Sequence, residues 1–267
     1  MYAKQLIALT AGAAALAGLS SSALTDGSWG KYQVGDIRSG YTFAEPETRA
    51  MQDDDFENPA MLVLDYGAEL WSTKDGDANK SCEDCHGDAE NSMKGVGARY
   101  PVFYGPWGKP INIELRINEC RQNNMKAKPY KYESNEMLGM TAFLKYQSRD
   151  MPVTVDIGGP NKPFYIKGKE FYYERRGQLD MACKHCHEDN AGNMIRANLL
   201  SQGQSNGFPV YRLKWNKVGS LHRRFRGCNK QVRSKPFGYG SDEYVNLELY
   251  LAWRGRGLPV ESPAVRN

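Results

Sequence analysis

Two segments of the chain, 107 residues apart, show the hydrophobic spacing of an amphipathic helix. Each opens with a serine at a plausible N-cap position, has an acid in its first turn and stops before a proline. The first begins at Ser134-Asn135-Glu136 and places Met137, Met140 and Leu144 on one face, and the second begins at Ser241-Asp242-Glu243 and places Leu247, Tyr250 and Trp253. These matching patterns predict helices that close two copies of one small, mainly α domain.

The N-terminus has a different hydrophobic pattern. An apolar run from Leu6 to Leu19 leads into Ser20-Ser21-Ser22-Ala23, which is typical of a secretory signal peptide cleaved near Ala23. A membrane anchor is the alternative, but the run is shorter than the roughly 20 residues that cross a bilayer. No later segment is apolar enough to span a membrane, so we expect a mature chain that is soluble in the periplasm.

Turn-forming residues divide the rest of the chain. Gly158-Gly159-Pro160 follows the first closing helix and predicts a domain boundary. We therefore expect a signal peptide over 1–23, an irregular extension over 24–60 that wraps the first domain and holds one helix, a first domain over 61–158 and a second domain over 159–267.

The six cysteines form two equivalent triplets. Cys82-Glu83-Asp84-Cys85-His86 and Cys183-Lys184-His185-Cys186-His187 are both C-x-x-C-H, the motif of covalent haem attachment. Cys120 follows His86 by 34 residues, and Cys228 follows His187 by 41. Each half of the chain thus repeats the same arrangement.

The C-x-x-C-H motif suits haem because two thiols can add to the vinyl groups of one porphyrin edge while the next histidine reaches the iron. Structural disulfides or a zinc site are alternatives, since the cysteine count is even and the chain is exported. However, the two motifs lie 101 residues apart, and neither alternative explains a histidine after both. We therefore predict two covalently bound haem c groups, with His86 and His187 as proximal ligands.

The sixth iron ligand is usually methionine in electron-carrying cytochromes, and the first half offers Met125 and Met140. After His187 only Met194 remains, too near the attachment motif to cross to the other face of the haem. Cys228 lies at a suitable distance, and the repeat places Cys120 equivalently, so we infer His/Cys ligation in both halves. A Cys120–Cys228 disulfide or two inert thiols remain alternatives. Thiolate ligation lowers the reduction potential of iron, which favours chemistry at the ligand over simple electron transfer.

The charge of the chain is informative only locally. With 35 basic and 31 acidic residues the net charge is +4, and neither a lysine-rich tail nor zinc-finger spacing adds a case for nucleic acid. Basic residues nevertheless gather around Cys228: Arg223, Arg224, Arg226, Lys230, Arg233 and Lys235. The equivalent stretch before Cys120, Arg116-Ile117-Asn118-Glu119, is almost without net charge. Arginines lower a thiol pKa and bind oxyanions, so Cys228 suits an anionic sulfur or phosphorus compound. Alternatively, these arginines pair with haem propionates or lie on a solvated face.

The mature chain resembles the diheme SoxA subunits of the SoxAX cytochromes, the L-cysteine S-thiosulfotransferases of bacterial sulfur oxidation. The resemblance rests on both C-x-x-C-H motifs and on four further stretches: Asn118-Glu119-Cys120-Arg121, Arg224-Phe225-Arg226-Gly227-Cys228, Glu248-Leu249-Tyr250-Leu251-Ala252 and Pro263-Ala264-Val265-Arg266. It implies two tandem class I cytochrome c-like domains with haems on Cys82 and Cys85 and on Cys183 and Cys186. It also implies axial pairs His86/Cys120 and His187/Cys228, a persulfide at the catalytic Cys228, and substrate binding by Arg224.

The resemblance further implies a reaction and its partners. Thiosulfate would be joined oxidatively to the SoxY cysteine of the carrier SoxYZ, with electrons passed to cytochrome c, and a monohaem SoxX subunit would complete a heterodimer. Two rival functions use the same motifs: a plain diheme electron carrier in which the arginines serve docking, and a thiosulfate dehydrogenase that forms tetrathionate without a carrier.

Overall fold

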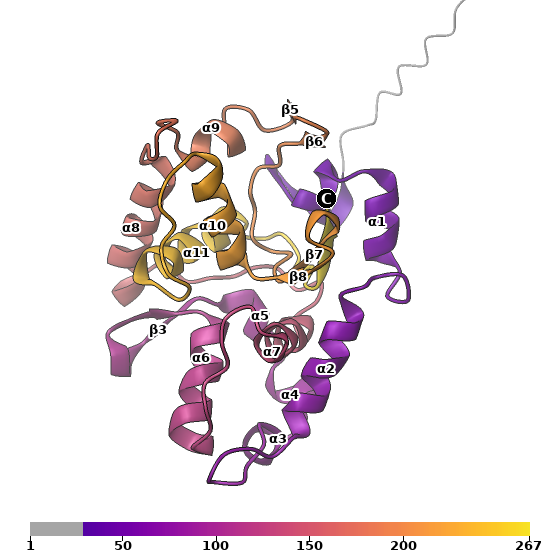
Figure 1. Cartoon of the computed structure of the whole chain (residues 1–267), viewed down its shortest axis with the longest axis vertical. Coiled ribbons are helices and arrows are strands. Elements are labelled where there is room, and N and C mark those ends of the chain that lie inside the picture. The colour runs from indigo at the N-terminus through magenta and orange to yellow at the C-terminus, as the bar shows by residue number, and fades with distance from the viewer. Residues whose placement is uncertain (1–28) are drawn as a thin grey trace, which may run out of the picture.

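The chain folds as two similar helical halves, seen in a computed structural model that describes residues 29–267 (Figure 1). The first repeat, the lower half of Figure 1, runs from α2 to α7, and the second, the upper half, from α8 to α11. In the first repeat the elements are α2 (Met61–Ser72), α3 (Glu83–His86), α4 (Ala89–Ser92), α5 (Val96–Arg99), β3 (Val102–Tyr104), β4 (Lys109–Ile111), α6 (Ile113–Cys120) and α7 (Asn135–Tyr146). In the second they are α8 (Lys162–Tyr173), α9 (Cys183–His187), β5 (Met194–Ile195), β6 (Asn198–Leu199), β7 (Val210–Arg212), β8 (Lys217–Gly219), α10 (Leu221–Gln231) and α11 (Asp242–Arg254). The predicted mainly α, tandem architecture is confirmed.

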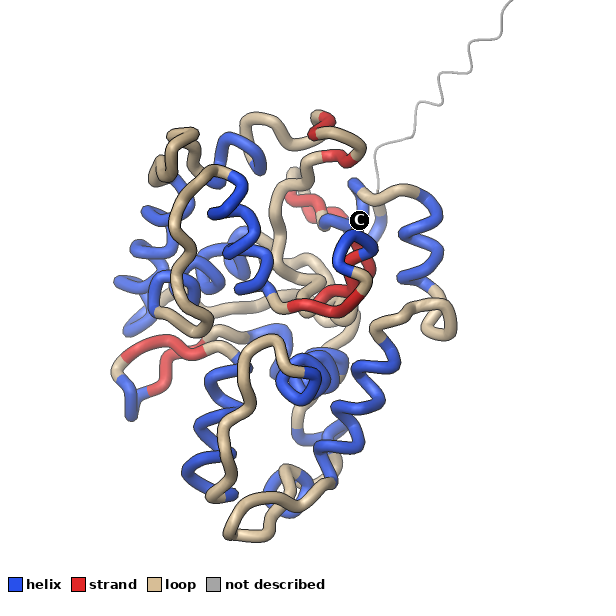
Figure 2. Tube along the Cα trace, viewed as in Figure 1, coloured by secondary structure: helices blue, strands red, loops and turns tan. Residues whose placement is uncertain are grey.

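Helices dominate the trace, and the strands are short (Figure 2). β3 pairs antiparallel with β4, and β7 pairs antiparallel with β8. β7 also pairs in parallel with β9 (Ala264–Arg266), with Arg212 opposite both Lys217 and Arg266. The two hairpins lead directly into α6 and α10, so they position the helices that carry Cys120 and Cys228.

Each repeat is built on a close crossing of its first and last long helices, α2 with α7 and α8 with α11. A Cβ atom on Gly67 would lie 2.1 Å from the carbonyl oxygen of Gly139, and one on Gly168 would lie 1.9 Å from that of Asn246. No side chain fits at such separations, so glycine permits the backbones to meet.

The predicted serine caps of α7 and α11 are confirmed. The Ser134 hydroxyl accepts from the Met137 amide, and the Ser241 hydroxyl accepts from the Tyr244 amide. Both helices turn their predicted apolar residues inward, with Met137 and Leu247 at 1% and 2% exposure. They end at Tyr146 and Arg254, before Pro152 and Pro259.

The N-terminal extension corrects one expectation. Over its described residues, 29–60, it forms β1 (Gln33–Val34), β2 (Ile37–Arg38) and one α-helix, α1 (Pro46–Asp53), with short 3₁₀ turns, and it packs mainly on the second repeat beside the C-terminus (Figure 1). The prediction that it wraps the first domain was wrong. The reason is the buried Glu261 carboxylate, which accepts hydrogen bonds from Ser39 Oγ and from Gln52 Nε2. A buried carboxylate needs such donors, and the extension supplies them.

The structure does not test two predictions, the signal peptide and the domain boundary. The signal peptide over 1–23 lies outside the described residues. Within residues 29–267, no helix is long and apolar enough to cross a membrane. The boundary at Gly158-Gly159-Pro160 falls where a 3₁₀ turn, Gly159–Asn161, leads into α8, and it stays a prediction.

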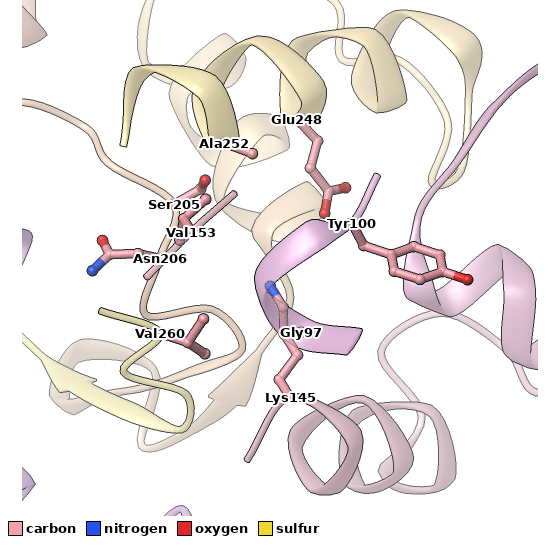
Figure 3. A pocket seen from close by; sticks show the side chains of 9 residues that line it. All are labelled: Gly97, Tyr100, Lys145, Val153, Ser205, Asn206, Glu248, Ala252 and Val260. Atoms are coloured by element: carbon pink, nitrogen blue, oxygen red, sulfur yellow. The ribbon is translucent and has the colours of Figure 1, made fainter. Parts of the chain in front are cut away.

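The repeats meet across an interface that is part apolar and part polar. The bridge between Pro152 and Pro259 joins the two closing segments, and Val153 N donates to Leu258 O at 2.9 Å. A cavity of about 10 Å³ lies between the repeats, with Lys145 and Glu248 reaching it from opposite sides (Figure 3). Its volume is that of about one water molecule, so the interface is closely packed around its charged groups.

Candidate functional site

Each C-x-x-C-H motif occupies a single helical turn, α3 or α9, held by the second variable residue of the motif. The Ser81 and Asp84 side chains each accept from the other's backbone amide, at 3.0 and 2.9 Å. In the second motif the Ala182 amide lies 2.8 Å from His185 Nδ1, so His185 takes the capping role of Asp84. The reciprocal cap in the first motif and the one-way cap in the second explain why a short isolated turn is helical and brings its cysteines and histidine together.

The predicted axial cysteines lie on the helices that follow the hairpins. Asn112 caps α6, which ends at Cys120, and Ser220 caps α10, which carries Cys228 in its third turn. The thiol of Cys120 lies near that of Cys82, and the thiol of Cys228 lies near those of Cys183 and Cys186. Each cysteine therefore faces the attachment motif of its own repeat. All six cysteines are free, which argues against a Cys120–Cys228 disulfide.

The surroundings of His187 resemble those of a metal-ligating histidine. Its Nδ1 lies 2.8 Å from the carbonyl oxygen of Ser201, so that nitrogen is taken up by the backbone and Nε2 is free to face a metal. Gly203, at φ +73°, lets the same loop close on the ring, because a Cβ there would lie 2.9 Å from Nδ1. The His187 ring is also within hydrogen-bonding reach of the Cys228 thiol. His86 is exposed and lies against Trp71, with 5.9 Å between the ring centroids.

Each motif also faces an apolar wall suited to a porphyrin. Cys82 packs against a cluster from α2, α4, α6 and α7, and Cys183 against one from α8, α10 and α11. The first cluster is Trp71, Ala89, Ile113, Ile117, Met137, Met140 and Leu144; the second is Phe171, Tyr172, Leu221, Phe225, Tyr244, Leu247, Tyr250 and Leu251. Thiols, a backbone-fixed histidine and an apolar wall together fit a covalently attached haem.

The two predicted axial thiols differ in their electrostatics. Burial raises a thiol pKa, but at Cys228 the charge of Arg224, a hydrogen bond from His187 and the charge of Arg212 outweigh it and bring the pKa to about 7. At Cys120 burial prevails over the charge of Arg116, and the pKa is raised. Burial and the neighbouring thiol raise the pKa of Cys82 to about 11 and that of Cys183 to about 12. Of the two predicted axial thiols, Cys228 is therefore the one that ionises near neutral pH.

The arginines before Cys228 have separate roles. Arg223 Nη1 lies 3.5 Å from Glu133 Oε2 across the repeat interface, and its guanidinium lies 4.5 Å from the Trp215 ring centroid. Arg226 donates to the Phe237 carbonyl and lies over Tyr239. Among residues 29–267, no side-chain carboxylate lies within 4.0 Å of the Arg224 guanidinium. Of the three, Arg224 is the one whose charge is directed to Cys228.

Sequence reasoning missed Arg212, on β7, whose charge also acts on the Cys228 thiol. It lies 16 positions before the cysteine and outside the basic run. A comparison of the two repeats could have found it: the residue 16 positions before Cys120 is the uncharged Tyr104, so the arginine at the equivalent position before Cys228 is a charge present only in the second repeat. Sequence reasoning also missed Ser201 and Gly203, which fix His187 from a loop.

A cavity of about 390 Å³ opens beside His187 on the surface of the second repeat. Its lining mixes basic, acidic and aromatic side chains, among them Lys169, Tyr173, Glu188 and Arg254. Arg254 pairs with Glu188 at 3.2 Å. Neither Cys228 nor the arginines of α10 line this cavity.

Comparisons with known proteins agree with this arrangement. The family described as SoxA/TsdA, cytochrome c domain, matches residues 66–153 and 167–260. L-cysteine S-thiosulfotransferase subunit SoxA from Pseudaminobacter salicylatoxidans is 50% identical over 86% of this chain and 80% of its own length. The subunit of the same name from Rhodovulum sulfidophilum is 46% identical over 87% and 81%. The crystal structure of SoxXA from P. pantotrophus matches with a TM-score of 0.84 and 45% identity, over 86% of this chain and 87% of that one.

Proposed function

The chain belongs to the SoxA/TsdA family of cytochromes c, and from this premise we propose that it is the SoxA-type subunit of an L-cysteine S-thiosulfotransferase. In this proposal it joins thiosulfate to a cysteine of a carrier protein, SoxY of SoxYZ, and passes the electrons to a c-type cytochrome. The observation that carries the proposal is the Arg224 guanidinium, without a carboxylate partner among the described residues, beside a thiol that favours its anionic form. Such a site attracts an anion and presents a sulfur nucleophile to it.

Membership of a cytochrome c family implies covalently bound haem c, and we propose two haems. Cys82 and Cys85 would bind one and Cys183 and Cys186 the other, with axial pairs His86/Cys120 and His187/Cys228. Support comes from the grouping of each cysteine triplet within its own repeat. When bound, the haems supply a route by which electrons leave the site.

The chain's own residues then account for sulfur transfer. Arg224 holds the thiosulfate dianion, and the terminal sulfur at Cys228, carried as a persulfide, forms a bond to the outer sulfur of thiosulfate as two electrons leave. The carrier thiolate next attacks that same thiosulfate sulfur, which releases the Cys228 sulfur and leaves the carrier with an S-thiosulfonate. Overall, one thiol and one thiosulfate give one carrier conjugate, one proton and two electrons, which the acceptor cytochrome takes up.

The partners of the proposed enzyme follow from the same family. A monohaem SoxX subunit would complete a heterodimer, which the similarity to a solved SoxXA complex supports. The apolar N-terminal run supports export, so we place the enzyme in the periplasm.

Mass spectrometry of the carrier tests the proposal. The holoprotein with its SoxX partner is incubated with thiosulfate, the carrier protein and oxidised cytochrome c, and we expect the carrier to gain one thiosulfate as the cytochrome is reduced. Arg224→Gln should lower this activity strongly. The matched control is Arg116→Gln, which removes the arginine four residues before Cys120 and should leave conjugation in place.

Two results would contradict the proposal. Tetrathionate made at full rate without the carrier would identify a thiosulfate dehydrogenase. Full conjugation by a Cys228→Ala protein that retains both haems would identify a plain electron carrier.

A further inference from the structure

The segments that carry the two axial cysteines correspond position by position. β3, β4 and the start of α6 recur as β7, β8 and the start of α10 at a constant offset of 108 residues, which also relates Cys120 to Cys228. The offset therefore pairs the side chains around the two cysteines. It pairs Tyr104 with Arg212, Arg116 with Arg224, and Glu119 with Gly227.

In the first repeat these positions form a closed network around a carboxylate. Tyr104 donates its hydroxyl to Glu119 Oε1 at 2.7 Å, and Arg116 Nη1 lies 2.5 Å from Glu119 Oε2. The Glu119 side chain is only 8% exposed. The carboxylate thus occupies the space between the two partners and neutralises the arginine next to Cys120.

In the second repeat the arginine partner remains, as Arg224, but the carboxylate and the tyrosine are gone. Gly227 has no side chain, and a Cβ there would meet no atom within 4 Å. Arg212 now replaces the tyrosine; its Nε donates to the main-chain oxygen of Asn267 at 2.7 Å, and its guanidinium lies 4.9 Å from the Trp215 ring centroid. Across the described part of the chain, neither Arg212 nor Arg224 has a side-chain carboxylate within 4.0 Å.

Among the described residues the two guanidiniums have the Cys228 thiol but no side-chain carboxylate beside them, so their mutual repulsion is unfavourable in a half-buried site. Burial and the charge of Arg224 lower the pKa of Arg212 to about 10. A bound dianion would relieve this repulsion, and two planar forks match the oxygens of a sulfonate group.

We infer that Arg212 is a second substrate-binding residue, which together with Arg224 holds the sulfonate end of thiosulfate in the place that the Glu119 carboxylate fills in the first repeat. This inference rests on the proposed function. Holding the sulfonate between the arginines leaves the outer sulfur of thiosulfate free for Cys228. Glycine at 227 is required because a carboxylate there would occupy the same place.

Calorimetric titration with thiosulfate tests the inference without turnover. The holoprotein with its partner is titrated in the absence of carrier and acceptor. We expect Arg212→Gln to raise the Kd about 10- to 100-fold, the usual effect of losing a charge-assisted contact. Lys214→Gln, which removes an exposed charge from the same hairpin, should leave the Kd unchanged. Haem content and haem reduction potentials are measured on every variant.

A second pair of variants tests the same idea with Arg212 intact. Gly227→Glu restores the internal carboxylate, whereas Gly227→Gln adds a side chain of similar size without its charge. We expect the Kd of Gly227→Glu to exceed that of Gly227→Gln at least tenfold. This pair decides the matter if Arg212→Gln fails to fold.

The outcomes separate this inference from the proposed function. If the unmodified protein neither binds nor conjugates thiosulfate, the proposed function fails. If it does both while Arg212→Gln binds thiosulfate equally well, only the role of Arg212 is overturned. Loss of haem or a shifted potential in Arg212→Gln with an unchanged Kd would also overturn it, because Arg212 would then act on a haem propionate.

Discussion

The buried carboxylate of Glu114 should make the stability of the protein depend on pH. Glu114 lies in the first turn of α6 and is 7% exposed, close to Glu248 on α11 of the other repeat. Glu248 has the hydrogen-bonding partners: Asn112 Nδ2 donates to its Oε2 at 3.1 Å, and His222 Nε2 lies 3.2 Å from the same oxygen. Glu248 therefore keeps its charge, and Glu114 is left as the weaker acid.

The size of the effect follows from the pKa of Glu114. Burial, and then the charge of Glu248, raise this pKa from 4.5 to about 7. Because the raised pKa belongs to the folded state, the free energy of unfolding is highest below pH 4.5 and falls as the pH rises through 7. At 1.36 kcal/mol per pKa unit, the loss is at most about 3 kcal/mol. Glu114→Gln keeps the shape of the side chain and removes this loss.

Urea unfolding of the holoprotein at pH 5 and pH 8 measures the effect. We expect Glu114→Gln to be more stable than the unmodified protein at pH 8 by about 1 to 3 kcal/mol, with a much smaller difference at pH 5. Glu243→Gln, which removes an exposed acid in the first turn of α11, should keep the original slope. An unchanged slope in Glu114→Gln would refute the reasoning, because Glu114 would then be ionised in the folded protein throughout this range.

Two further predictions concern the helices. Gly168→Ala should destabilise the second repeat by about 2 kcal/mol or more, because its Cβ would clash with the Asn246 carbonyl oxygen. The control is Gly238→Ala, whose Cβ would meet no atom within 4 Å and which should be nearly neutral. Thermal unfolding compares the two variants, and equal midpoints would contradict the close helix crossing. Ser134→Ala and Ser241→Ala should each lower the free energy of unfolding by about 1 kcal/mol, and aspartate at the same positions should restore most of that loss. Chemical unfolding measures both effects. An unchanged free energy of unfolding in the alanine variants would mean that water replaces the cap.

Features that depend on neighbours in the sequence could be predicted. The serine caps, the apolar faces of α7 and α11 and the duplication all rest on short-range patterns, and each was confirmed. The grouping of each cysteine triplet followed from the repeat. The attachment and axial roles of the cysteines and histidines stay predictions, although their placement agrees with them.

Contacts between distant segments could not be predicted in the same way. Ser39 reaches Glu261 across 222 positions, and Asn112 reaches Glu248 across 136. No local pattern indicates that Glu261 will be buried, so nothing in the sequence showed which domain the extension would cover. Arg212 was missed for a related reason: its relevance depends on the fold of a hairpin rather than on its distance from Cys228 in the sequence.

The duplication explains how one scaffold can give two centres with different chemistry. In both repeats a cap, a short helix and an arginine four residues earlier bring a thiol opposite an attachment motif. The two repeats differ in whether this arginine already has a carboxylate partner within the protein. Glu119 supplies one inside the first repeat, so an external dianion would have to displace a carboxylate that is only 8% exposed and held by Tyr104, Arg116 and Asn123. Gly227 supplies none, and Arg212 adds a second positive charge where the first repeat has a tyrosine. On this inference, two substitutions in otherwise equivalent frameworks close one site to anions and open the other, without changing the helices that position the cysteines.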